Sequence, residues 1–151
     1  MRVNNSVLFF LISYLITSPT LSAADVISLR IENMQKADKA MTMIKNNIIK
    51  SDYKKAQKNA EDINKWANEM LNYFPPDSGA SIQNTSAASS EIWKDFKLFK
   101  TYVSDKKNNT KLMVVAAKNN KMENLKQSFT DTRKTCITCH EKFRNWAINQ
   151  E

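Results

Sequence analysis

Near its C-terminal end the chain reads Thr135-Cys136-Ile137-Thr138-Cys139-His140-Glu141-Lys142-Phe143-Arg144. The run Cys136-x-x-Cys139-His140 has the spacing at which c-type haem is attached. Two thiols one helical turn apart can add to the two vinyl groups of a haem, and the next imidazole then lies under the iron as its proximal ligand. These residues are the only two cysteines and the only histidine in the chain. The sequence therefore predicts one covalently attached haem c per chain.

Other uses of two cysteines and one histidine fit this pattern poorly. A structural zinc site usually takes four Cys or His ligands, and adjacent Cys139 and His140 are badly placed to share one tetrahedral ion. A thioredoxin-like dithiol is expected beside a βαβ pattern, which this sequence does not show. A simple disulfide in a secreted chain would leave His140 without a role. Haem attachment is the interpretation that uses all three residues.

The first 24 residues have the three parts of a secretory signal peptide. Arg2 gives the positive start, residues 7–16 are apolar, and Ser22-Ala23-Ala24 forms a small-residue cleavage site before Asp25. The apolar run is shorter than the roughly 20 residues of a membrane-spanning helix, so an uncleaved anchor is the less favoured alternative. We expect export to the periplasm, where covalent haem attachment takes place in bacteria, and no stable membrane insertion after processing.

Length and charge narrow the class of protein further. Removal of residues 1–24 from a chain of 151 leaves 127, which suits one domain with one buried core. The formal net charge is +8, from 23 Lys and Arg against 15 Asp and Glu. Because the lysines are scattered at helical spacing, we expect a solvated face, with a docking patch for an acidic redox partner as the alternative. No nucleic-acid-binding motif is present, so nucleic acid is not an expected partner.

Apolar residues recur at steps of three and four, which is the period of amphipathic helices. We expect helices over residues 25–49, 52–73, 90–117 and 122–149, with the third frayed or kinked at its polar residues 105–110. The breaking residues Pro75, Pro76 and Gly79 precede the one long loop, residues 80–89. This pattern predicts an all-α antiparallel four-helix bundle over residues 25–151, with the haem motif inside its fourth helix. These apolar residues form four stripes, one for each expected helix. In chain order the stripes are Leu29, Ala37, Met41, Ile44 and Ile48; Tyr53, Ala56, Ala60, Ile63, Ala67, Met70 and Phe74; Ile92, Phe96, Phe99 and Val103; and Leu125, Phe129, Cys136, Cys139, Phe143 and Trp146.

Motifs in all four predicted helices resemble those of the class II c-type cytochromes, the cytochrome c′ family, which includes low-spin relatives with Met/His ligation. Residues 30–34 (Arg-Ile-Glu-Asn-Met) resemble the family's Arg-x-x-x-(Met/Leu/Phe), and residues 74–75 resemble its Phe-Pro. Residues 91–93 resemble its Glu-Ile-Trp, and residues 134–144 its haem segment. The motifs occur in the family's order across nearly all of the mature chain.

The resemblance implies a four-helix bundle with one haem c linked to Cys136 and Cys139, and His140 as the proximal iron ligand. It also suggests that Arg144 shapes the proximal side of the iron. Arg30 lies one helical turn from Met34, which makes it a candidate for a charge-assisted bond with a haem propionate. Either arginine could instead be a solvated charge. Many relatives form homodimers through the first two helices. The candidate aromatic residues for such an interface are Tyr53, Trp66 and Tyr73, and burial within one chain is an equal alternative for them.

The sixth coordination position of the iron decides the function, and no second histidine is present to fill it. A methionine thioether is the natural alternative, because Met/His ligation raises the reduction potential and suits electron transfer. The resemblance selects Met34, four residues after Arg30, where a Met either binds the iron or only blocks its distal face. The other methionines on helical faces are expected to fill the core. By type alone the candidates are Met34, Met41, Met43, Met70, Met113 and Met122.

Two non-enzymatic functions remain open from the sequence. The first is a one-electron carrier for periplasmic redox proteins, in which His140 and Met34 both bind the iron. The alternative is a five-coordinate haem protein that binds nitric oxide or carbon monoxide, with Met34 guarding an apolar distal pocket. A haem peroxidase is the weakest interpretation, because that chemistry needs a distal acid–base group and no distal histidine exists.

The signal peptide gives the first test. Protein purified from the periplasm should begin at Ala24 or Asp25 and carry the mass of one haem, because the signal peptidase cuts after small residues. Intact-mass spectrometry measures both values. A haem-loaded species that retains Met1 would show that the segment is an anchor instead.

Overall fold

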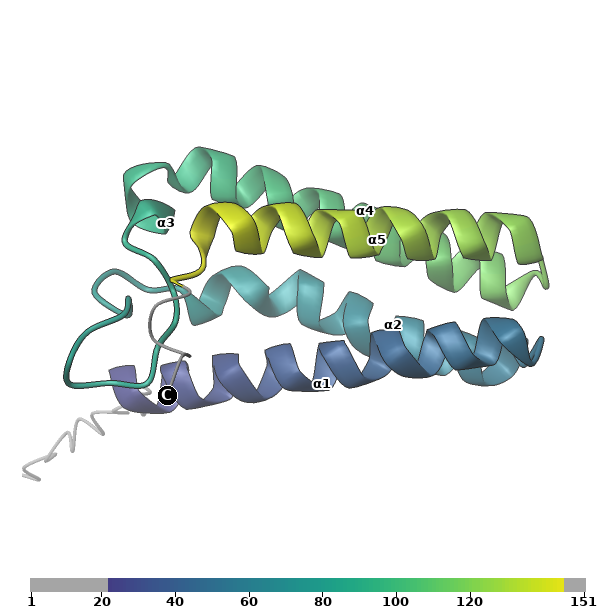
Figure 1. Ribbon diagram of the computed structural model, residues 1–151, viewed down its shortest axis with the longest axis horizontal. Coiled ribbons are helices and arrows are strands. Elements are labelled where there is room, and N and C mark those ends of the chain that lie inside the picture. The colour runs from purple at the N-terminus through teal and green to yellow at the C-terminus, as the bar shows by residue number, and fades with distance from the viewer. Residues whose placement is uncertain (1–21, 146–151) are drawn as a thin grey trace, which may run out of the picture.

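Helices build most of the described chain. The computed structural model describes residues 22–145. Its long helices are α1 (Ala23–Ile49), α2 (Tyr53–Glu69), α4 (Phe96–Lys118) and α5 (Met122–Phe143), with a 3₁₀ turn η1 (Met70–Tyr73) and a short helix α3 (Glu91–Lys94) between α2 and α4. Along the chain, successive long helices run in opposite directions along the long axis of the molecule (Figure 1). The predicted all-α, antiparallel four-helix bundle is confirmed. Residues 1–21 of the predicted signal peptide and Trp146 of the fourth stripe lie outside the described residues.

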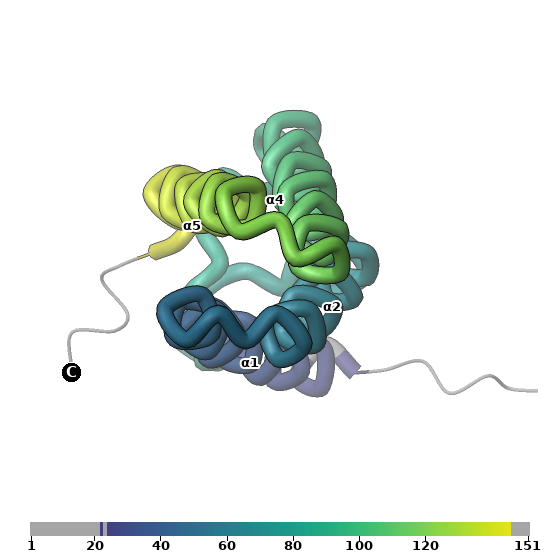
Figure 2. The backbone as a smooth tube through the Cα atoms, turned by 90° about the vertical axis from the view of Figure 1, so that its right-hand side faces the viewer, coloured from purple at the N-terminus to yellow at the C-terminus, as the bar shows by residue number. Residues whose placement is uncertain are grey.

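The long helices form a ring that is loosely closed on one side. α1 packs on α2, α2 on α4, and α4 on α5, whereas α1 and α5 make the sparsest contact of these neighbouring pairs. The view along the bundle shows α5 and α1 next to each other on the same side of the ring (Figure 2). This side of the bundle is where the side chains of the haem motif are found.

Side chains near the helix ends fix where the helices begin. Asp52 and Asp95 each accept a hydrogen bond, 3.0 Å long, from a backbone N–H in the first turn of α2 and α4. Such caps satisfy donors that have no partner within the helix. The turns before α2 and α5 contain no Gly or Pro, and Ser51 and Asn120 take left-handed φ values of 53° and 52°. Polar residues therefore make the tight turns that the sequence did not mark with Pro or Gly.

The apolar stripes meet in one core, as expected for amphipathic helices. Phe99 packs edge-on against Phe74 and Phe143, with ring centroids 4.7 and 5.5 Å apart. Trp66, a candidate interface residue, is buried within its own chain, where it packs against Tyr73. Burial of this apolar surface is the main favourable term in folding. The largest apolar side chains with almost no exposure come from every long helix and α3, and they are Ile44, Ile63, Ile92, Met113 and Leu125.

The third predicted helix differs from the expectation in two ways. It does not run unbroken from residue 90, because Asp95 leaves the helical conformation (φ −128°, ψ 60°) to cap α4. The polar residues 105–110 do not interrupt α4. Two of them, Lys106 and Thr110, are buried, and the Thr110 hydroxyl donates to the Lys106 carbonyl oxygen at 2.8 Å. The prediction of a frayed or kinked segment was therefore wrong.

The fourth helix is shorter than predicted. α5 ends at Phe143 rather than near residue 149, because Arg144 takes an extended conformation (φ −102°, ψ 133°). Arg144 forms an isolated antiparallel bridge with Ala88, and the Ser89 N–H donates to the Phe143 carbonyl oxygen at 2.9 Å. These bonds tie the long loop to the end of the helix that carries the haem motif.

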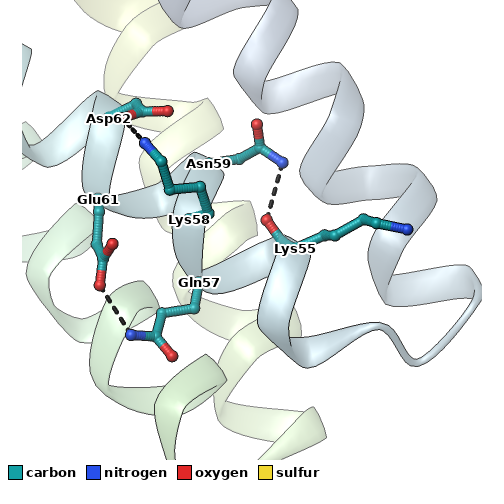
Figure 3. A network of polar contacts seen from close by, with 6 residues as sticks. All are labelled: Lys55, Gln57, Lys58, Asn59, Glu61 and Asp62. Carbon is teal, nitrogen blue, oxygen red and sulfur yellow. Dashed lines mark hydrogen bonds and ion pairs between the residues drawn. The ribbon is translucent and has the colours of Figure 1, made fainter.

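The outer face of α2 is polar and solvated. Gln57 donates to Glu61 at 2.8 Å, and Lys58 pairs with Asp62 one turn further along (Figure 3). Surface pairs of this kind contribute little to stability. The predicted solvated face is present on this helix. No helix within residues 22–145 combines the length and the apolar character needed to cross a membrane.

Arg30 of α1 holds the loop of residues 74–90 onto the end of the bundle. Its side chain is buried, and one terminal nitrogen, Nη1, donates to the Tyr73 carbonyl and the Ser78 hydroxyl, both at 3.0 Å. The other, Nη2, donates to the Ser78 carbonyl and the Ser86 hydroxyl, both at 2.6 Å. The guanidinium carbon lies 4.6 Å from the centre of the Phe74 ring. Burial lowers the pKa of Arg30 to about 10, which leaves it charged at neutral pH.

Replacing Arg30 with Met should destabilise the fold. We expect the free energy of unfolding to fall by about 3 kcal/mol, because each buried partner left unpaired costs about 1–3 kcal/mol. Urea denaturation followed by circular dichroism measures the change. Lys36→Met is the control on the same helix, because it removes an exposed ion pair with Glu32. Its effect on the free energy of unfolding should stay within about 0.5 kcal/mol. Equal losses of stability in the two variants would contradict the role of Arg30 in holding the loop.

Candidate functional site

Two adjoining cavities lie on the loosely closed side of the bundle. Their volumes are about 430 and 800 Å³. Cavities of this size suit small-molecule or cofactor binding. The side chains that line both are Met34 and Asp38 of α1, Met70 of η1, and Cys139 and His140 of α5.

The helical spacing on α5 puts the haem motif on one face. Residues three and four apart on a helix are neighbours, so Cys136 lies beside both Cys139 and His140. All three are half-buried and line the smaller cavity, and neither cysteine is in a disulfide. Burial raises the pKa of the Cys139 thiol to about 11. The geometry that the sequence predicted for two thioether links and one axial ligand is present.

The imidazole of His140 is in the form that binds a metal. Burial lowers the pKa of His140, and the charges of Lys106 and Arg144 lower it further, against an opposing contribution from Asp38. A pKa below the usual value of about 6.5 leaves the ring neutral at pH 7, with a lone pair available on one nitrogen.

The structure separates the six candidate methionines. Met34, Met41 and Met70 line the cavities, and only Met34 and Met70 line both. Met113 is fully enclosed in the core, Met43 is exposed, and Met122 is half-buried at the start of α5 and lines neither cavity. Met41 was expected to fill the core; it is half-buried and packs against the core, and it also lines the smaller cavity.

The two arginines named from the sequence both line the larger cavity. The four terminal donors of Arg30 bind Tyr73 of η1 and two serines of the loop of residues 74–90, so within the described residues only its Nε–H is left for a haem propionate. That pairing stays a prediction. Arg144 is half-buried, and its backbone N–H donates to the His140 carbonyl oxygen at 3.0 Å. Its charge acts on His140, as noted above, and its role at the proximal side also stays a prediction.

Sequence reasoning missed Lys106. This residue is 7% exposed and lines the smaller cavity together with the haem motif. The spacing of α4 held the signal, because position 106 follows Val103 by three residues and precedes Thr110 by four, and both of these are buried. Treating residues 105–110 as one polar run concealed the fact that one of its lysines faces inward.

The residues of the site fit a covalently bound haem. The thiols and the imidazole would supply the attachment and proximal positions, and the walls are largely apolar, as a porphyrin requires. Exposed cations at the edges of the cavities suit the two carboxylates of the haem. The apolar walls include Met34, Ala37, Ile63, Val103 and Phe129, and the exposed cations are Lys39, Lys45 and Arg133.

Known proteins with this sequence pattern and fold are cytochromes c′. The family model for cytochrome c′ matches residues 25–144. The cytochrome c′ of Thermochromatium tepidum has a TM-score of 0.75 and 21% identity, over 82% of this chain and 97% of that chain. A cytochrome c′ with an unusual ligand-controlled dimer dissociation has a TM-score of 0.78 and 20% identity, over 83% and 98%. The nitrosyl complex of a cytochrome c′ variant from Alcaligenes xylosoxidans has a TM-score of 0.73 and 19% identity, over 83% and 99%. No curated protein sequence matches the chain.

Replacing Cys136 and Cys139 together with Ala should abolish covalent haem. The two thiols are the only ones in the chain, so no other thioether link can form. Acid–acetone extraction followed by mass spectrometry measures the haem that remains on the polypeptide. Thr138→Ala, between the two cysteines, is the control and should keep its haem. Covalent haem in the double variant would refute the attachment site.

Proposed function

The chain belongs to the cytochrome c′ family and binds covalent haem c, and from that premise we propose that it is a periplasmic one-electron carrier. Haem iron gains and loses one electron without any change in the bonds of a substrate. In this proposal His140 of α5 and Met34 of α1 are the two axial ligands. The role of the protein is to hold the cofactor, fix its ligands and set its reduction potential.

The observation that carries the proposal is that Met34 lines both cavities with His140. The two residues approach from α1 and α5, the two helices between which the bundle is loosely closed. A neutral thioether paired with a neutral imidazole stabilises ferrous iron and raises the potential. Met70 lines both cavities as well, but it is 3% exposed and is packed in the hydrophobic core. Met34 is half-buried and packs only against the edge of that core.

The surface charge suits a carrier that docks briefly on acidic partners. Lys39 and Lys45 are exposed and lie at the two cavities. Charges near the cofactor steer an oppositely charged partner toward it and raise the rate of encounter. A homodimer is a second interaction in the proposal. One related cytochrome c′ has a ligand-controlled dimer dissociation, and Tyr53 of this chain is half-buried on α2.

Gas binding is the competing function. A related cytochrome c′ variant forms a nitrosyl complex, and the apolar walls around Met34 would accept a small neutral diatomic molecule. In that case Met34 would cover the distal face without binding the iron, and nitric oxide or carbon monoxide would displace it sideways. The two functions differ in one measurable property, the coordination number of the iron.

If Met34 binds the iron, the wild-type protein should be low-spin in both oxidation states and react slowly with carbon monoxide. Met34→Ala should open the sixth position, give high-spin iron and speed ligand binding. The midpoint potential should fall by at least about 60 mV, a tenfold change in a one-electron equilibrium. Absorption and electron paramagnetic resonance spectra report the spin state.

Met41→Ala and Met70→Ala are the matched controls, because both residues line the cavity wall. They should leave the iron low-spin. A wild-type protein that is already high-spin and binds nitric oxide readily would establish gas binding and exclude the carrier with a Met34 ligand. A high-spin form produced by Met70→Ala but not by Met34→Ala would transfer the distal role to Met70.

A further inference from the structure

Lys106 is a buried cation in the wall of the haem cavity, and within residues 22–145 it has no partner of opposite charge. It lines the smaller cavity together with Cys136, Cys139 and His140. Within residues 22–145 its ammonium group forms no ion pair and donates no hydrogen bond. Asp38 lines the same cavity, but it is exposed and does not pair with Lys106. The positive charge therefore faces the space in which the haem is held.

Packing alone gives no reason for a lysine at this position. The neighbours of Lys106 on the inner face of α4 are Val103 and Thr110, and the other five lysines of that helix are all exposed. Taking a charge out of water is costly unless a partner repays it, and an apolar side chain of similar size is often at least as stable. Residues that break the pattern of a core in this way are expected at functional sites.

The charge of Lys106 reaches the residues that hold the haem. Lys106 and His140 line the same cavity, whose volume is about 430 Å³, so the charge lies within electrostatic range of the proximal position. Burial lowers the pKa of Lys106 itself. Interactions between charges are stronger in a buried cavity than in water, because solvent and salt screen them less.

We propose that Lys106 is a tuning residue that raises the reduction potential of the haem through its buried positive charge. Reduction adds one electron from an external donor to ferric iron, and no bond to Lys106 forms or breaks. Because the ferrous state has one positive charge fewer than the ferric state, a nearby cation favours it. The proposal deepens the proposed function, but it requires only the haem site and not a particular sixth ligand.

Three haem-loaded variants of the full protein test this role. Lys106→Met removes the charge and keeps the length of the side chain, and Lys106→Arg keeps the charge. Lys107→Met removes the same charge from the exposed neighbouring position on α4. Midpoint potentials are measured by spectroelectrochemical titration at low salt and at 1 M salt, where the screening length falls to about 3 Å.

We expect the potential of Lys106→Met to fall by at least about 60 mV, a tenfold change in the one-electron equilibrium, at both salt concentrations. Lys106→Arg should remain near the wild-type value. Lys107→Met should have a smaller effect that disappears at 1 M salt. The absorption and spin state of Lys106→Met should match the wild type, because the residue acts without binding iron.

Three results would overturn the proposal. Equal potentials for the wild type and Lys106→Met would show that Lys106 carries no charge felt by the iron. An equal loss in Lys106→Arg would trace the effect to packing. A changed spin state in Lys106→Met would make Lys106 a ligand rather than a tuning residue. If Lys106→Met fails to load haem, Lys106→Gln is the second neutral variant. Failure of the Met34 experiments would not affect this test, because the potential is measurable with either coordination number.

Discussion

The structure depends on one constraint, which is that α5 must present two thiols and an imidazole to a space that protein side chains do not fill. Protein interiors are normally close-packed, and apolar walls that face an open space lose the dispersion contacts they would otherwise make. Here α1 and α5 supply most of the lining of the smaller cavity, with Ile63 of α2 and Val103 of α4 among the rest, and α1 and α5 touch each other sparsely. The position of α1 must therefore be fixed by its contacts with α2 and with the loop before α3. The haem then supplies the packing that is missing on the remaining side.

Arg30 shows how the bundle holds α1 in place without help from α5. Four donors of one side chain bind oxygens at Tyr73, Ser78 and Ser86, so α1 is attached to the segment that follows α2. The same segment continues to Ala88, which bridges to Arg144 directly after the haem motif. A single loop thus joins both walls of the cofactor site. It closes the end of the bundle at the larger cavity, whose wall includes Thr85, Ala87 and Ala88.

The sequence predicted the parts of this structure that depend on local periodicity. The helical stripes and the Cys136, Cys139 and His140 spacing needed no long-range information, and they predicted the bundle and its attachment face. The break at Asp95, where α3 ends and α4 is capped, was missed. In the sequence, an aspartate with this role cannot be told from a polar surface residue. The end of α5 depends on its bridge to Ala88, 56 positions earlier, and no local pattern reports such a contact. The burial of Lys106 was concealed by its polar neighbours.

Arg30 and Lys106 are buried cations on different helices, and their surroundings give them different roles. The charge of Arg30 is met by two carbonyls, two hydroxyls and an aromatic ring, so it is solvated by its own chain. The charge of Lys106 meets no such set within the described residues, and it borders the space reserved for the cofactor. The dipoles around Arg30 offset part of its charge, so its effect on a nearby redox centre is weakened. A charge without such partners in a buried cavity is offset less, so its interaction with that centre is stronger.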